Sequence, residues 1–208
     1  MKNKIKTTIF LLIFSSSLFA SSISFSGGYT TLSMREGNQN ITLSNNANVI
    51  LETIEITADK IQLSGEDYSD IECTGNISFI DKENLITLRC SSLKYDRANE
   101  TLVIDSWVEI DDLKNNIYAT ASYMEYDLDN SIIDLLVEVK LLHDSDNEIM
   151  RCNCDILRFN LETNNISLLG NSRVFWQKNT YKAQAISINL NNNDISMDGS
   201  IEANIQTE

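Results

Sequence analysis

Stretches in which apolar and polar residues alternate recur about every 30 residues along most of this chain. Such alternation is typical of a β-strand with one buried face. The stretches start near residues 41, 71, 102, 133, 166 and 195, so successive starts are 30, 31, 31, 33 and 29 residues apart. A repeat of this length predicts a stack of similar units, because no unit can bury its apolar face alone.

A second strand-like segment precedes each stretch, and a polar turn such as 96–99 joins the two. Its apolar pairs include Leu93/Tyr95 and Met124/Tyr126. A small residue comes three positions before five of the six pairs: Ala58, Cys90, Ala121, Cys154 and Ala183. This odd spacing moves the buried face to the other side of the strand, which requires a bend or bulge. We therefore predict an all-β, solenoid-like stack of about six units of about 30 residues, each with a corner.

Composition narrows the class of protein further. The chain has 208 residues, no proline, and 42% hydrophobic residues, enough for a packed core. Its 16 basic and 30 acidic residues give a formal charge of −14. This balance argues against nucleic acid as a partner, because phosphate backbones are bound by basic surfaces.

The N-terminus has the pattern of a secretory signal peptide over residues 1–22. Three lysines within residues 2–6 precede an apolar run at 9–14, and a serine cluster and Leu18-Phe19-Ala20 follow. Cleavage after Ala20 or Ser22 would remove those three lysines and no acids, which changes the charge from −14 to −17. The signal peptide predicts an exported protein. An uncleaved N-terminal membrane anchor is the alternative, since residues 7–34 carry no charge.

Three units share a more detailed pattern of small, apolar, aromatic and turn residues. It reads Cys90-Ser-Ser-Leu93-Lys-Tyr95-Asp96, then Ala121-Ser-Tyr-Met124-Glu-Tyr126-Asp127, then Cys154-Asp-Ile-Leu157-Arg-Phe159-Asn160. Over residues 28–205 the chain resembles the OstA/LptA-like domain, the periplasmic bridge family of lipopolysaccharide transport. One departure is that Ser106 and Val137 stand where other units have glycine, at 75, 170 and 199.

The resemblance implies an open, V-shaped β-jellyroll whose apolar groove shields the acyl chains of lipopolysaccharide or a related glycolipid on the way to the outer membrane. It also implies a periplasmic location, end-to-end self-association through exposed strand edges, and LptC-like inner-membrane and LptD-like outer-membrane partners. The residues expected to line the groove are Ile61, Leu63, Ile77, Phe79, Leu93, Tyr95, Ile104, Val108, Met124, Tyr126, Leu135, Val137, Val139, Leu157, Phe159, Leu168, Ile186 and Ile188.

Two other functions remain open at this point. The same apolar rows could fill a closed core, which would make the chain an exported β-solenoid with a structural or interaction role. If the N-terminal apolar segment is retained, the chain would instead be the membrane-anchored LptC-like partner.

We find no sequence pattern that indicates catalysis, a cofactor or a metal site, and we expect a protein that is not an enzyme. The single histidine, His143, lies in a polar segment and is expected to be a solvated turn residue. The cysteines at 73, 90, 152 and 154 fall in inward columns, where we expect buried free thiols, with a Cys73–Cys90 disulfide as the alternative. One histidine and a Cys-x-Cys pair do not form a zinc pattern.

Overall fold

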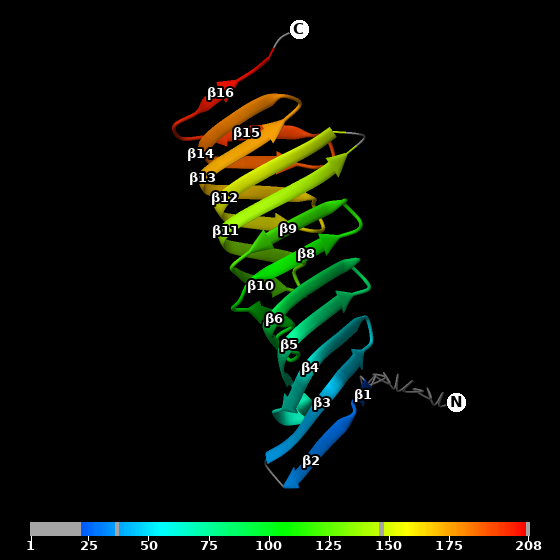
Figure 1. Cartoon of the computed structure of the whole chain (residues 1–208). Helices are drawn as coiled ribbons and strands as arrows, with labels where there is room; N and C mark the ends of the chain where they lie inside the picture. Colours follow the sequence, from blue (N-terminus) through cyan, green and yellow to red (C-terminus); the bar gives the residue numbers. More distant parts are fainter. Residues whose placement is uncertain (1–21, 36–37, 146–147, 207–208) are drawn as a thin grey trace, which may run out of the picture.

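The computed structural model describes residues 22–35, 38–145 and 148–206, which form an elongated stack of β-strands (Figure 1). The predicted signal peptide lies outside these residues except for Ser22. Within the described ranges there is no α-helix, and so none that could cross a membrane. The all-β fold predicted from the repeat is confirmed.

The strands and one short 3₁₀ turn follow one another along the chain. They are β1 (Ile23–Ser26), β2 (Tyr29–Arg35), β3 (Asn38–Leu51), β4 (Ile54–Ser64), η1 (Glu66–Tyr68), β5 (Asp70–Asp81), β6 (Ile86–Asp96), β7 (Thr101–Ile104), β8 (Val108–Asp112), β9 (Ile117–Ala121), β10 (Tyr123–Asp127), β11 (Ile132–Ser145), β12 (Glu148–Asn160), β13 (Asn165–Trp176), β14 (Asn179–Asn189), β15 (Asp194–Asp198) and β16 (Glu202–Asn204).

These strands form a single antiparallel sheet in which neighbours along the chain are mostly neighbours in space. In Figure 1 the colours therefore pass in order from β2 at one end to β16 at the other. Such a meander needs no crossover helices, because antiparallel strands can be joined by short turns.

Every long strand bends near its middle, so the sheet folds into two layers. The pairing of β4 with β5 skips from Thr57 to Lys60, and that of β5 with β6 skips from Thr74 to Ile77. The strand halves 29–35, 38–44, 60–64, 70–74, 92–96, 101–104, 123–127, 132–136, 156–160, 165–169, 185–189 and 194–198 form layer one. The remaining halves form layer two, and the line of bends is the corner between the layers.

The corner has the composition that the repeat predicted. Ala58, Ala121 and Ala183 are buried there, and each comes just before the point where the inward face changes sides. Other strands cross the corner with two successive residues at positive φ. These pairs are Asn45 and Asn46 on β3, Gly75 and Asn76 on β5, Val137 and Glu138 on β11, Gly170 and Asn171 on β13, and Gly199 and Ser200 just after β15. These pairs are the bulges that turn each strand from one layer into the other.

The turns lie in two rows, one along the free edge of each layer. In layer one, the Arg97 amide donates to the Ser69 carbonyl at 2.9 Å, which links two successive turns. In layer two, the Lys82 amide donates to the Thr53 carbonyl at 2.9 Å in the same way. We call the gap between the two rows, opposite the corner, the mouth.

Candidate functional site: the apolar interior and its mouth

The two layers enclose a continuous apolar interior that runs the length of the stack. Buried side chains from both layers belong to one cluster, from Ile41 near the first unit to Ile188 near the last. Contacts join the layers directly. Phe79 of layer two and Tyr95 of layer one meet edge to face, with ring centroids 6.1 Å apart.

The structure places the predicted groove residues on the inward face, with one exception. No member of the set except Val137 is more than 6% exposed. Tyr95, Tyr126 and Phe159 occupy one column of layer one, as the repeat predicts, because each pairs across the strands in the same register. Whether these residues contact lipid remains a prediction.

Val137 is the exception, and its placement inside the groove is wrong. It is 56% exposed and has a φ of 64°, because it is the first of the two bulge residues at the corner of β11. The alternation of Ile133, Leu135, Val137 and Val139 looks unbroken in sequence. The bulge inserts residues 137–138 between the paired Leu136 and Val139, so the apolar face skips Val137.

Side chains fill the space between the layers along the predicted groove. A cavity of about 10 Å³ lies among Ile110, Asp112, Leu135 and Phe159, which is room for roughly one water molecule. The two layers are thus packed together over these residues. An acyl chain would reach the interior only if the layers moved apart.

Within the part of the chain that the structure describes, both ends of the apolar interior are uncovered. At the first end, Phe25 on β1 and Leu32 and Met34 on β2 are exposed although they continue inward columns. At the other end, Ile201 and Ile205 beside β16 are exposed as well. Among the described strands, β2 pairs only with β3 and β16 only with β14, so each end strand presents an unpaired backbone edge next to apolar side chains.

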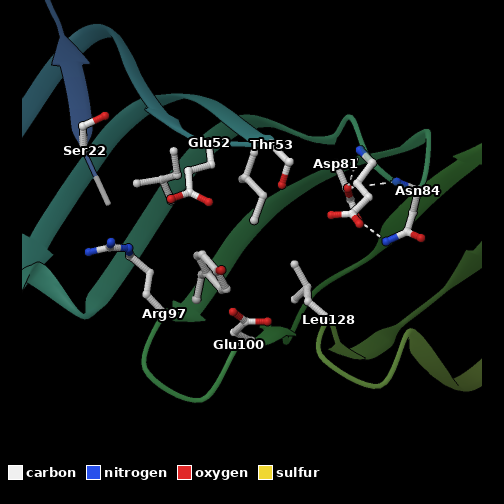
Figure 2. Close-up of a pocket in the computed structure, with 12 residues that line it drawn as sticks. Ser22, Glu52, Thr53, Asp81, Asn84, Arg97, Glu100 and Leu128 are labelled. Carbon is white, nitrogen blue, oxygen red and sulfur yellow. Dashed lines mark hydrogen bonds between the residues drawn. The ribbon is translucent and has the colours of Figure 1, made fainter. Parts of the chain in front are cut away.

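The mouth contains a hollow of about 320 Å³ between the two rows of turns (Figure 2). We call it the mouth hollow. Its inner wall includes the buried residues Leu51, Ile54 and Tyr95, and burial raises the pKa of the Tyr95 hydroxyl to about 12. Its outer rim is charged and polar. The rim residues are Glu52, Thr53, Glu83, Arg97 and Glu100.

Beside the hollow, hydrogen bonds join the two layers across the mouth. The Tyr126 hydroxyl of β10 donates to Asp81 Oδ2 at 2.7 Å, and the Asn84 amide donates to the Tyr126 oxygen at 2.9 Å. Asn84 also donates to Asp81 Oδ2 at 2.8 Å, as Figure 2 shows. Burial, together with the Asp81 carboxylate, holds the pKa of Tyr126 far above its usual value. We call this group of three residues the latch.

The other candidate residues are the four cysteines and the histidine. Cys73, Cys90, Cys152 and Cys154 are free thiols, and burial raises the pKa of each, to about 11 for Cys90 and about 12 for the other three. His143 is not a solvated turn residue, which corrects our expectation. It is a buried residue of β11, paired with Ile117 and Met150, because β11 continues through the polar segment. Among the described residues no group of histidines, cysteines and acids could hold a metal ion.

The latch was missed in the sequence, although a signal for part of it exists. The pattern Asp-x-x-Asn recurs at 81–84, 96–99, 112–115 and 127–130. In each case the asparagine side chain donates to the aspartate that begins the turn. The pattern identifies Asp81 and Asn84 as turn residues, but it does not reveal the contact with Tyr126, which is 45 residues from Asp81.

Comparisons with known proteins add a fold-level likeness only. No protein-family model and no curated protein matches the chain. A solved structure that aligns with it is LptH, described as the LptA homologous periplasmic component of the conserved lipopolysaccharide transport device from Pseudomonas aeruginosa. The alignment covers 89% of this chain and 96% of that chain, with 9% sequence identity and a TM-score of 0.29. Similarity at this level does not bear on function, which has to be argued from this chain's own residues.

Proposed function

We propose that this protein is a periplasmic lipid-transport bridge that shields the acyl chains of lipopolysaccharide or a related glycolipid between its two layers. The observation that carries the proposal is the apolar interior, which extends from one uncovered end of the stack to the other. Burying each methylene of an acyl chain stabilises it by about 0.8 kcal/mol relative to water. A continuous apolar path can therefore hold a chain at many positions along its length.

The architecture supports this use of the interior. Bent strands join the layers along the corner, whereas the backbone bonds between turns link successive units within one row at the mouth. A sheet folded along one line can open at the opposite side without breaking its strand pairing. The packed columns would then part to admit acyl chains.

Site-specific photo-crosslinking tests the proposal. A photoreactive residue at Leu93, Ile104, Met124 or Leu135, which point inward, should label lipid that co-purifies with the protein. Mass spectrometry of the extract would identify that lipid. A photoreactive residue that replaces Lys94, Glu109 or Glu138, on the outer surface or at the corner, should not label lipid. Each variant needs a circular dichroism spectrum like that of the unmodified protein. Equal labelling from both sets would contradict the proposal.

A second function is favoured by the packing of the interior. Because side chains fill the space along the predicted groove, the protein would also work as an exported β-solenoid with a structural or interaction role. The two functions differ in one measurement. A lipid bridge purifies with bound lipid or takes lipid up when it is offered, and a filled-core solenoid does neither.

The proposed partners follow from the proposed function. They are lipopolysaccharide or another glycolipid, further copies of this chain at its two ends, and LptC-like inner-membrane and LptD-like outer-membrane components. If the N-terminal segment is retained, the protein would itself be the membrane-anchored component. Sequencing the N-terminus of the protein extracted from cells distinguishes the two arrangements.

A further inference from the structure

The mouth hollow changes from apolar to polar over its depth. Leu51, Ile54 and Tyr95 in its inner wall belong to the buried core, and the acidic residues at its rim are exposed. Figure 2 shows Glu52 and Thr53 on one side of the hollow, with Arg97 and Glu100 facing them from the other. An amphiphilic molecule has the same gradient, since its chain avoids water and its head requires it.

The latch lies beside this hollow and shares Asp81 and Asn84 with its lining. Tyr95 and Tyr126 belong to one column, and Asp81, which lines the hollow, accepts the bond from Tyr126. One unit further along the same column, Phe159 replaces tyrosine and has no hydroxyl group. Asp112, which lines a small cavity together with Phe159, accepts hydrogen bonds from the backbone amides of Lys114 and Asn115 in its own turn. The layers are thus hydrogen-bonded at Tyr126, next to the hollow, in a way that Phe159 cannot reproduce.

We propose that the mouth hollow is a lateral port, where an amphiphile passes its acyl chain between the layers while its head stays at the rim, and that the Tyr126–Asp81 bond is the latch of this port. The proposal rests on the proposed function, because it assumes that acyl chains occupy the interior. To the proposed function it adds the place where acyl chains enter, which is the side of the molecule and not its uncovered ends.

The rim also indicates which head groups the port accepts. Glu52, Glu83 and Glu100 present carboxylates, which accept hydrogen bonds from hydroxyl or ammonium groups. Among the described lining residues, Arg97 supplies the cationic group, and its Nη1 donates to the Asp67 and Tyr68 carbonyls at 3.0 and 3.1 Å. A head that donates hydrogen bonds, such as a sugar, is therefore favoured over a head whose only polar group is a phosphate, which the carboxylates repel.

Uptake kinetics test the port. The probes are a dodecyl maltoside and a dodecyl phosphate, each with a fluorophore at the chain end that brightens in apolar surroundings. Tyr126→Phe removes the latch hydroxyl and keeps the ring, so the maltoside should enter about fivefold faster, the change expected when the closed state loses one hydrogen bond. Tyr118→Phe, on the outer face of layer two, is the matched control and should change nothing.

A second variant keeps the test sound if Tyr126→Phe impairs folding. Thr53→Trp places a large ring in the hollow from an exposed turn, and it should slow maltoside uptake severalfold. Ser91→Trp, on the exposed side of the corner, should not. The dodecyl phosphate should enter more slowly than the maltoside in the unmodified protein.

The outcomes separate this inference from the proposed function. Uptake that is unchanged in both Tyr126→Phe and Thr53→Trp overturns the port and leaves the lipid bridge standing, with passage through the ends. Equal rates for the two probes overturn the preference for head groups that donate hydrogen bonds. If the unmodified protein neither purifies with lipid nor takes up either probe, the proposed function and the port are both wrong.

Discussion

Val137 has a backbone conformation that suits glycine better than a β-branched residue. Its φ is 64°, and glycine holds the equivalent bulge position at 75, 170 and 199 with φ between 68° and 75°. A residue with a β-carbon in this region costs on the order of 1–3 kcal/mol. Because Val137 is 56% exposed, it recovers little of this cost through packing.

We therefore expect Val137→Gly to stabilise the protein by about 1 kcal/mol, after subtracting the extra freedom that glycine gives the unfolded chain. The midpoint of urea denaturation should rise. Ile156→Gly is the matched control, since Ile156 is also exposed and β-branched but lies in an extended strand. That change should lower the midpoint, and a fall in both variants would show that Val137 is not strained.

His143 gives the fold a pH dependence near neutrality. Burial lowers its pKa, and Asp144 and Asp112 oppose this effect less strongly. The folded state therefore favours neutral imidazole, whereas the unfolded chain takes up a proton near its ordinary pKa of about 6.5. Stability from this residue is full above that pH and is lost as the pH falls toward the folded-state pKa.

The test compares urea midpoints between about pH 7.5 and pH 5.5 for the unmodified protein and His143→Gln. We expect the midpoint to fall with pH in the first and to stay level in the second. Carboxylates such as Glu55 and Asp127, whose pKa values hydrogen bonds and ion pairing lower, add their own loss only at more acidic pH. Since His143 is the single histidine, a slope that persists in His143→Gln would assign the effect to another group.

At the scale of the strand, the corner depends on small side chains. Ala121 is fully buried at the end of β9, opposite Val108. Enlarging it forces neighbouring side chains out of their preferred rotamers, which typically costs 1–3 kcal/mol. We expect Ala121→Leu to lower stability by about 2 kcal/mol.

The matched variant for this prediction is Ser91→Leu, which adds a similar side chain on the exposed side of another corner. It should change the free energy of unfolding by less than about 0.5 kcal/mol, as most surface substitutions do. Chemical denaturation measures both. If the two substitutions had equal effects, the small corner residues would not be needed for the bend.

The strands and corners could be predicted from sequence because their signals are local. Alternation identifies the inward residues, and the three-residue step from Ala58 to Ile61 reveals a change of face. The same alternation misplaced Val137, because a two-residue bulge preserves the parity of the apolar pattern. His143 was misassigned for a related reason, since polar neighbours hide a strand whose inward face is continuous.

At the scale of the whole molecule, the distance between the layers could not be predicted. Periodicity reports which face of a strand is apolar, but an open groove and a filled core use the same apolar residues. The latch depends on a contact between Tyr126 and Asp81, which belong to different units and layers. Only the folded sheet brings such residues together.

The two ends of the stack lead to our last prediction, which concerns assembly. In the described ranges, both end strands have unpaired backbone edges and exposed apolar side chains, among them Leu32 on β2 and Ile201 beside β16. No proline is present to block pairing. We expect the protein to form rods in which β2 of one copy lies against the last strands of the next, so that its mean mass in sedimentation rises with concentration.

An inward-pointing charge on an edge strand opposes such pairing. Leu32→Lys should therefore be monomeric by itself, and Thr31→Lys, on the opposite face of the same strand, should still form rods. Because the contact joins two different ends, Leu32→Lys retains one working end. Mixed with the unmodified protein it should cap rods and shorten them in proportion to its share. If the unmodified protein stays monomeric at high concentration, end-to-end assembly is wrong. If Leu32→Lys forms stable dimers through its remaining end, the contact joins like ends instead.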